Sequence, residues 1–338
     1  MWGGWALWAR LRLSSISNAV ALTERWETRF WVFETLDTVL MAIFRARSSA
    51  KINLSLDILE RLPNGYHTLR SLVHPVGLWD ELELEFLDDT SQIVFHCDNE
   101  QLQGDDNLCV RAFKAWREAT GFAGGASIRL QKNIPFGAGL GGGSGNAAAV
   151  LRMANARARS LRNGELSQIA AKLGADVSLF LSDSPVLMEG IGERLTPVSS
   201  LEGWIVLLKP HEGFATPAIY RAWDESGMQS HNGTQALLTA WQDAEVETVA
   251  PLLTNDLERA ARLISPLPAR CIELLDVAGA KGARLSGSGS ACFGLCSSPA
   301  HAREVQRKIE LELAKDVLLQ GATTFVAPLV ARGVALLP

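Results

Sequence analysis

The twelve residues from Pro135 to Asn146 carry the strongest chemical signal in the sequence. Six of them are glycines, and the stretch runs directly into Ala147-Ala148-Ala149, which favours a helix. Glycine-rich backbone lets a large ligand approach closely. A helix that starts there offers free N–H groups and the positive end of its macrodipole, which together bind anions. The stretch therefore predicts a phosphate-binding loop at a helix N-terminus.

Two common phosphate-binding patterns fit this loop poorly. A Walker P-loop ends in Gly-Lys-Ser/Thr, and this loop contains no lysine. Gly137, Gly139 and Gly142 satisfy G-x-G-x-x-G, but Pro135 stands where a dinucleotide fold requires the end of a central strand. A flexible linker is the remaining alternative, and the alanine run that follows argues against it.

Phosphoryl transfer also needs a group that positions or deprotonates the attacking hydroxyl. Asp176 is the best candidate for this base, because it follows a Gly-Ala step at a predicted helix end beside apolar residues. An N-cap for the next segment is the alternative. Lys51 lies in a strand that is otherwise rich in apolar residues, where it is either an edge-strand charge or a functional cation.

The elements that must position these residues mix strands and helices. Period-two alternation predicts strands over 49–58 and 81–86, the second with one wet face. Asn107 ends a run that predicts a helix N-cap. Further helices are predicted over 165–173, near 235–248 and over 300–315, and further strands over 128–130, 204–208, 291–295 and 323–327. Because strands and helices mix without strict alternation, the predicted fold class is α+β.

Length and composition set the outer limits. A chain of 338 residues suggests two domains, and the net charge of −5 argues against a nucleic-acid surface. The five cysteines form no C-x-x-C pair, which favours a reduced, cytoplasmic setting without a structural metal. No apolar run reaches membrane-spanning length, so we expect no membrane partner.

Residues 1–40 do not match the rest of the chain. They hold five of the ten tryptophans and no lysine, and their acidic residues fit neither a secretory signal nor a transit peptide. We expect an extension outside the fold. The domains are then expected over 46–200 and 201–338, because a fresh buried strand begins after the 199–203 stretch.

The glycine loop, Pro-x-Gly-Ala-Gly-Leu-Gly-Gly-Gly-Ser-x-Asn-Ala-Ala, resembles the phosphate loop of the GHMP kinases. That resemblance covers about residues 46–336. It implies a two-domain fold, with an N-terminal domain like ribosomal protein S5 and a ferredoxin-like C-terminal domain. It also implies ATP and Mg²⁺ as cofactors, with Ser144 as a metal ligand. The implied ATP-binding residues are Lys132, Pro135, Gly137, Ala138, Gly139, Leu140, Gly141, Gly142, Gly143, Ser144, Gly145 and Asn146.

Two further segments resemble the catalytic motifs of this family. Leu-Gly-Ala-Asp-Val around Asp176 is similar to the segment with the catalytic aspartate, and Ala-Lys-Ile-Asn-Leu around Lys51 is similar to the segment whose lysine pairs with it. Such a lysine would keep the carboxylate ionised and stabilise developing charge. Ser286–Ser290 is similar to a third motif, a loop that closes over the active site. Relatives usually have Ser-Ser where this chain has Ser-Gly at Gly145.

Gly-Tyr-His-Thr-Leu around Tyr66 and His67 resembles the branch of the family with a cytidine-diphosphate-linked methylerythritol as substrate. There the tyrosine stacks on the cytosine and the histidine bonds the base. Tyr220 falls where that branch has a second aromatic residue, and Asn53 falls where that branch has a residue that contacts the substrate. Stacking contributes about 1–3 kcal/mol per base, by analogy with single-strand recognition. A surface turn with a half-buried aromatic is the simpler alternative for Tyr66.

The resemblance implies an ATP-dependent kinase that phosphorylates the 2-hydroxyl of this cytidyl substrate in non-mevalonate isoprenoid precursor biosynthesis. The alternatives are another GHMP kinase of a small alcohol, or a catalytically inactive binding protein of the same fold. Retention of Lys51 with Asp176 argues against the inactive form, and the aromatic pair argues against a non-nucleotide alcohol. We expect a monomer or a homodimer with a small-molecule substrate and no nucleic-acid partner.

Overall fold

The structure is a computed structural model that describes residues 43–158, 160–241 and 244–338. The predicted extension over 1–40 lies outside the described residues. Within the described part of the chain, no helix is both long enough and apolar enough to cross a membrane.

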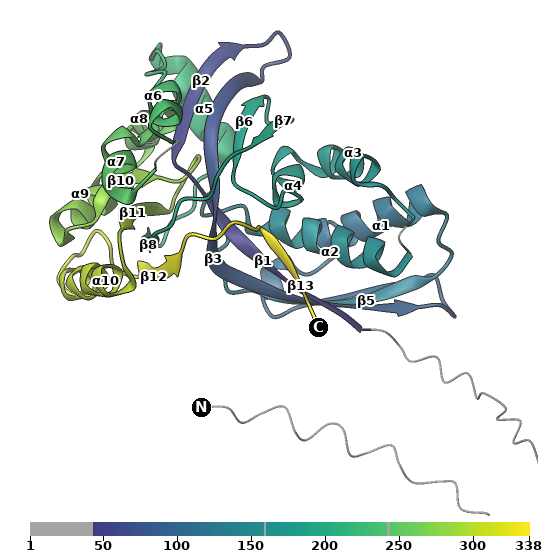
Figure 1. Ribbon diagram of the computed structural model, residues 1–338. Coiled ribbons are helices and arrows are strands. Elements are labelled where there is room, and N and C mark those ends of the chain that lie inside the picture. The colour runs from purple at the N-terminus through teal and green to yellow at the C-terminus, as the bar shows by residue number, and fades with distance from the viewer. Residues whose placement is uncertain (1–42, 159, 242–243) are drawn as a thin grey trace, which may run out of the picture. The chain divides into compact units, whose positions relative to one another are not determined.

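A nine-stranded sheet forms the first half of the fold (Figure 1). Its central strand is the long β3, His67–Leu87, which pairs antiparallel with β1, Ile43–Asn53. The predicted alternation over 81–86 is confirmed, because Leu82, Leu84 and Phe86 are buried and the glutamates between them are not. The other strands are β2 (Ser55–Arg61), β4 (Ile93–Cys97), β5 (Gly125–Gln131), β6 (Val186–Gly190), β7 (Arg194–Pro197), β9 (Thr254–Asn255) and β13 (Val334–Leu337).

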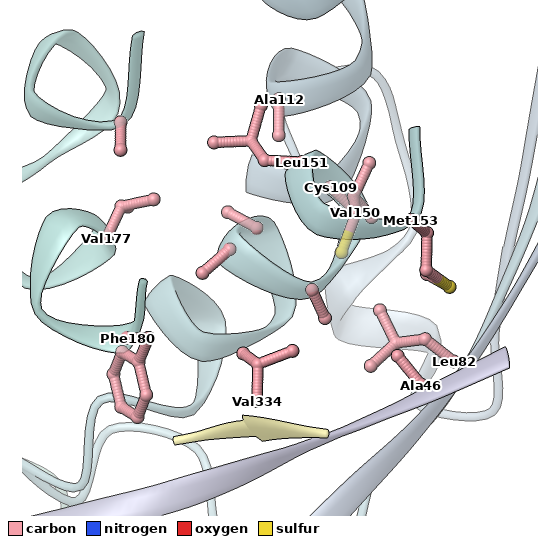
Figure 2. Packing of buried hydrophobic residues seen from close by; sticks show 14 of the residues in the cluster. Ala46, Leu82, Cys109, Ala112, Val150, Leu151, Met153, Val177, Phe180 and Val334 are labelled. Carbon is pink, nitrogen blue, oxygen red and sulfur yellow. The ribbon is translucent and has the colours of Figure 1, made fainter. Parts of the chain in front are cut away.

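Helix α2 (Gly142–Ala158) packs on β1 and β3, and three further helices pack around α2 on the same side of the sheet: α1 (Leu108–Thr120), α3 (Asn163–Leu173) and α4 (Ala175–Phe180) (Figure 1). Between them and the sheet lies a core that includes Leu82, Val150, Leu151, Phe180 and Val334 (Figure 2). Burying each large apolar side chain stabilises the fold by about 1.5–3 kcal/mol. This core fixes α2, and therefore the glycine loop that precedes it.

The second half is a four-stranded antiparallel sheet in the order β10-β11-β8-β12. Its strands are β8 (Trp204–Lys209), β10 (Lys281–Leu285), β11 (Cys292–Cys296) and β12 (Thr323–Pro328). In chain order this is 2-3-1-4, which is the ferredoxin-like arrangement expected. Its α-helices are α5 (Thr216–Ser226), α6 (Thr234–Ala240), α7 (Val246–Val249), α8 (Asp256–Ile264), α9 (Leu267–Ala278) and α10 (Pro299–Leu313). Two short 3-10 helices, Glu100–Leu102 and Ala250–Leu252, complete the described elements.

A separate core joins residues of the two sheets. Ile52 and Leu72 of the first sheet and Leu207 and Phe293 of the second are fully buried in it. The strand β13 also returns to pair with β1. The division at residue 200 stays a prediction, since the chain crosses between the sheets more than once.

Three local expectations differ from the structure. The strand predicted over 49–58 is two strands, β1 and β2, separated at Leu54. The helix predicted near 235–248 is in fact α6 and α7, which are separate helices. The helix α5 was not predicted, although Pro217 in its first turn and Gly227 at its C-cap are typical helix boundaries.

Candidate active site

The glycine loop ends inside α2, because that helix begins at Gly142 rather than at the alanine run. Gly139 and Gly141 adopt φ of +73° and +70°, a left-handed conformation that glycine adopts without strain. The first N–H groups of α2 have no partner in the preceding turn of helix. The predicted helix that follows the glycine loop is confirmed, but its N-terminus lies within the loop, at Gly142.

The second predicted loop, Ser286–Ser290, packs directly against the first. A Cβ atom on Gly139 would lie 2.3 Å from the Ser286 carbonyl oxygen, so no side chain fits there. The Ala291 N–H donates to the Ala138 carbonyl oxygen at 3.1 Å. The Ser286 hydroxyl donates to the Gly139 carbonyl oxygen at 3.3 Å. These contacts hold the two glycine loops, one from each half of the fold, as a single unit.

A cavity of about 340 Å³ lies on one side of the glycine loop. All of the predicted ATP-binding residues except Gly145 line it, and so do Asn107 and Leu108 at the start of α1. Asn107 also caps α1, because its side-chain oxygen accepts the Cys109 N–H at 2.9 Å. The cavity is large enough for part of a nucleotide, with the N-terminus of α2 at its wall.

Beneath this cavity lies a buried ion pair that sequence reasoning missed. The Asp80 carboxylate is fully buried and accepts from the Lys132 ammonium and from Asn146 Nδ2, the latter at 2.9 Å. It also accepts the backbone N–H groups of Asn133 and Ile134 at 2.8 and 2.9 Å. Asp80 therefore fixes the side chains of Lys132 and Asn146, which are two of the predicted ATP-binding residues. In the sequence, the only indication of this ion pair was a charged residue, Asp80, next to Trp79.

A second cavity, of about 240 Å³, lies on the other side of the loop. Gly139 and Gly141 line both cavities, so the loop is the wall between them. The second cavity also contains Lys51, Asn53 and Asp176. The three predicted residues come from β1 and α4, far apart in sequence, and meet here.

Lys51 and Asp176 form an ion pair in this second cavity. The Lys51 ammonium lies 4.0 Å from Asp176 Oδ2, with the lysine side chain 7% and the aspartate side chain 35% exposed. Burial lowers the pKa of Lys51 below that of a free lysine, and the Asp176 charge partly opposes this. The predicted pairing of these two residues has geometric support, with the carboxylate left accessible.

Asn53 holds the Lys51 ammonium from the other side. Its Oδ1 accepts from Lys51 Nζ at 2.7 Å, and its Nδ2 donates to the Ser71 hydroxyl at 2.8 Å. The ammonium is therefore fixed between an amide and a carboxylate. A Cβ on Gly287 would lie 3.1 Å from Asn53 Oδ1 and 3.3 Å from Lys51 Nζ, so the second glycine loop closes directly over this group.

The predicted base-binding residues lie beside this cavity. Tyr220 lines it, and burial together with the Asp176 charge raises the pKa of Tyr220 to about 12. The His67 ring stacks on Tyr220, with ring centroids 5.4 Å apart and planes inclined by 30°. Tyr66 stands at the turn before β3 with 65% of its surface exposed, and neither Tyr66 nor His67 lines the cavity itself.

Gly145 is the one predicted ATP-binding residue that does not line the first cavity. Its N–H donates to the Gly141 carbonyl oxygen within α2. A Cβ there would lie 3.2 Å from the Ser49 carbonyl oxygen and 3.4 Å from the Phe180 ring. A serine at this position would therefore point into the protein, and the departure from Ser-Ser removes no side chain from the cavity. Ser144, in contrast, lines the cavity.

We find no group of three or more His, Cys, Asp or Glu side chains that could hold a metal within residues 43–158, 160–241 and 244–338. His74 is a fully buried core residue. Its Nδ1 lies 2.8 Å from the Pro75 carbonyl oxygen and its Nε2 accepts the Leu201 N–H at 3.1 Å. Burial lowers the pKa of His74 to about 4, so this ring is neutral at pH 7.

A phosphate-type loop shared by two cavities, with a lysine–carboxylate pair on the acceptor side, is suited to moving a phosphoryl group between two bound small molecules. The family comparisons agree with this class. Residues 107–184 match the model of the GHMP kinases N terminal domain, and residues 242–315 match that of the GHMP kinases C terminal domain.

Curated relatives narrow the class. The chain is 38% identical over 264 residues to a 4-diphosphocytidyl-2-C-methyl-D-erythritol kinase of Geobacter sp. strain M21, covering 77% of this chain and 92% of that protein. It is 40% identical over 254 residues to the enzyme of that name from Solidesulfovibrio magneticus, covering 72% and 86%. The chain belongs to the 4-diphosphocytidyl-2-C-methyl-D-erythritol kinase family, within the GHMP kinases.

Solved structures support the same assignment. A crystal structure of 4-(cytidine 5'-diphospho)-2C-methyl-D-erythritol kinase matches with a TM-score of 0.72 at 33% identity, over 85% of this chain and 99% of that chain. A homoserine kinase from Cytophaga hutchinsonii matches with a TM-score of 0.69 at 17% identity, over 87% and 97%. The second likeness shows the fold alone. The two-domain α+β GHMP fold expected from the sequence is confirmed.

Proposed function

We propose that this chain transfers the γ-phosphoryl group of ATP to the 2-hydroxyl of 4-diphosphocytidyl-2-C-methyl-D-erythritol, a step of non-mevalonate isoprenoid precursor biosynthesis. The observation that carries this proposal is the position of Gly139 and Gly141, which line both cavities. A γ-phosphate held at that wall is presented to an alcohol in the second cavity. The names of the relatives supply the identity of the alcohol.

The glycine loop and the first turn of α2 hold the ATP phosphates. Their N–H groups and the helix macrodipole favour the negative charge that spreads over the transferred group. Lys132 and Asn146 line the same cavity and supply a cation and an amide close to that charge. Because Asp80 fixes both side chains, little reorganisation is needed when the nucleotide binds.

Asp176 is the group that orients and deprotonates the attacking hydroxyl. The new bond forms between the substrate 2-oxygen and the γ-phosphorus, and the bond from that phosphorus to the β–γ bridging oxygen breaks. The hydroxyl proton passes to the Asp176 carboxylate, and ADP leaves. Lys51, 4.0 Å from Asp176 Oδ2, keeps the carboxylate ionised and stabilises the charge that develops on the transferred group.

Mg²⁺ would bind chiefly through the ATP phosphates. Magnesium usually takes one or two protein oxygens together with substrate phosphates and water, so a protein site with few ligands fits the ion. Ser144 offers a hydroxyl in the nucleotide cavity and is the residue we assign to it. When bound, the ion neutralises charge on the phosphates.

The cytidyl end of the substrate lies near Tyr66, His67 and Tyr220. Tyr220 and the His67 ring that stacks on it form one side of this base site, and the exposed Tyr66 ring provides a second aromatic surface. Asn53 lines the second cavity together with Tyr220 and Asp176, and we assign it a contact with the substrate. We also propose a cytoplasmic location, which is supported by five buried cysteines that are all free thiols.

Turnover with a panel of acceptors tests the proposed function. The purified chain is incubated with ATP and Mg²⁺ and with the cytidyl substrate, mevalonate or homoserine, and ADP release is followed. We expect ADP release when the acceptor is the cytidyl substrate, and none when it is mevalonate or homoserine. Turnover of mevalonate or homoserine instead would identify another alcohol kinase, and no turnover of any acceptor, with ATP still bound, would identify an inactive binding protein.

A further inference from the structure

One row of side chains on α5 faces the acceptor side of the site. Thr216, Tyr220 and Asp224 are spaced four residues apart, so they lie on one face of this helix. The Thr216 hydroxyl lies 2.8 Å from that of Ser288 in the second glycine loop. Tyr220 lines the second cavity, and Asp224 lies one turn beyond it. Ile219 and Trp223, on another face of the helix, are buried.

Asp224 contacts both ends of the turn that carries Tyr66. Its Oδ1 lies 2.7 Å from Nε2 of His67, whose side chain is 5% exposed. Its Oδ2 lies 3.3 Å from Nε of Arg61. Arg61 ends β2 and His67 begins β3, so the carboxylate ties this hairpin of the first sheet to α5 of the second half. The turn is closed by the Leu62 N–H, which donates to the Tyr66 carbonyl oxygen at 2.7 Å.

We propose that Asp224 is a positioning residue for substrate recognition: it sets the base site by fixing the His67 ring and the Tyr66 turn against Tyr220. This inference rests on the proposed function, since it concerns how the same site selects the cytidyl group. Asp224 lies outside all of the sequence motifs that resemble the family. Its role is visible only in the structure, because α5 brings the Asp224 carboxylate to the hairpin between β2 and β3.

The contact also decides which His67 nitrogen carries the hydrogen. An ionised carboxylate can only accept, so the His67 nitrogen that faces Asp224, Nε2, is the donor. In the neutral ring the other nitrogen, Nδ1, is then an acceptor. An acceptor suits the exocyclic amino group of cytosine and not the carbonyl oxygen that uracil has at the same position. Asp224 thus favours a cytidyl over a uridyl substrate through His67.

The test compares three variants with the wild type. Asp224→Ala removes the contact, and Asp224→Asn keeps an oxygen that accepts from His67 Nε2. Glu225→Gln is the matched control: Glu225 is the next residue on α5, it is exposed, and it forms no ion pair with any residue in the described ranges. For each, kcat and KM are measured for ATP, for the cytidyl substrate and for its uridyl counterpart, together with Tm.

We expect Asp224→Ala to raise KM for the cytidyl substrate about 10-fold, which is the effect of losing about 1.4 kcal/mol of binding. The kcat value and KM for ATP stay within about twofold of wild type, because catalysis and nucleotide binding use other residues. The preference for the cytidyl over the uridyl substrate falls in the same variant. Asp224→Asn recovers part of the KM, and Glu225→Gln matches the wild type.

Three results would overturn this inference. The first is a KM for the cytidyl substrate in Asp224→Ala equal to that of Glu225→Gln. The second is an equal rise in KM for ATP together with a lower Tm, which would indicate general damage to the fold. The third is an unchanged cytidyl-to-uridyl preference in Asp224→Ala. Each requires a wild type that turns over the cytidyl substrate, and failure of that turnover would reject the proposed function instead.

Discussion

The buried pair of Asp80 and Lys132 gives the most quantitative prediction. In Asp80→Asn the amide oxygen can still accept the two backbone N–H groups, but the amide nitrogen faces the Lys132 ammonium and Asn146 Nδ2, both of which are donors. The lysine side chain is only 8% exposed, so its charge is left without a counter-charge. Removing one partner of a buried pair costs about 3–5 kcal/mol.

We therefore expect Asp80→Asn to lower the free energy of unfolding by about 3–5 kcal/mol. The double variant Asp80→Asn/Lys132→Met removes the uncompensated cation as well, so that no buried charge is left without a partner. The double variant should therefore be more stable than Asp80→Asn alone. This difference isolates the charge effect from the loss of hydrogen bonds.

Urea denaturation at pH 7 measures these free energies, provided that the m-value is unchanged. Asp105→Asn is the matched control, because Asp105 pairs with Lys114 at 3.1 Å on the surface with side chains 85% and 43% exposed. Exposed pairs contribute little, so we expect almost no change. If Asp80→Asn were as stable as this control, or if the effects of Asp80→Asn and Lys132→Met were additive, the assigned role of the pair would be refuted.

Four further outcomes follow from the site and its surroundings. In the wild type, kcat should decrease as the pH rises and Lys51 loses its proton. This decrease should occur at a lower pH than the ordinary lysine pKa of 10.5, because burial lowers the pKa of Lys51. Lys51→Arg should move that fall to higher pH, because guanidinium stays charged; an unmoved profile would assign the titration to another group. Tyr66→Ala and Tyr220→Ala should each raise KM for the cytidyl substrate by about 5-fold to 150-fold, from the loss of about 1–3 kcal/mol of stacking, with KM for ATP unchanged. Equal changes in both KM values would mean that the rings only pack. Gly145→Ser should bind ATP with a KM within about twofold of wild type, because its Cβ faces the Ser49 carbonyl oxygen at 3.2 Å rather than the nucleotide; loss of ATP binding would show that the turn cannot shift by the few tenths of an ångström needed. Burial lowers the pKa of His74 from 6.5 to about 4. As the pH falls through this interval, His74 takes up a proton in the unfolded chain before it does so in the folded protein. The free energy of unfolding therefore decreases, by about 3 kcal/mol in total once the pH is below 4. Denaturant titrations at several pH values should show a shallower loss in His74→Gln, and an equal loss would exclude His74 as the cause.

The fold class and the phosphate loop could be predicted from the sequence because their signals are local. Glycines at Gly139 and Gly141, a strong helix former directly after them, and alternation over 81–86 each depend on residues close in the chain. The N-cap at Asn107 is another such case, confirmed by its bond to the Cys109 N–H. Local backbone preference and side-chain period are sufficient for these features.

The sequence also indicated the pairing of Lys51 with Asp176, but only through likeness to a family. The residue types and spacing around Lys51 and Asp176 leave an edge-strand charge and an N-cap as alternatives. The tertiary structure brings the lysine ammonium to 4.0 Å from the carboxylate and buries it against Asn53. Burial is what lowers the pKa of Lys51, and burial is a property of the packed fold.

Other features were decided by the tertiary structure alone. Asp80 reaches Lys132 and Asn146 across 52 and 66 residues of sequence, and Asp224 reaches His67 across 157. The direction of the missing side chain at Gly145, in helix α2, likewise depends on Ser49, which lies on strand β1. Such contacts form because two sheets and their helices pack with a particular register. A carboxylate in the sequence has no local mark that tells a buried anchor from a solvated charge.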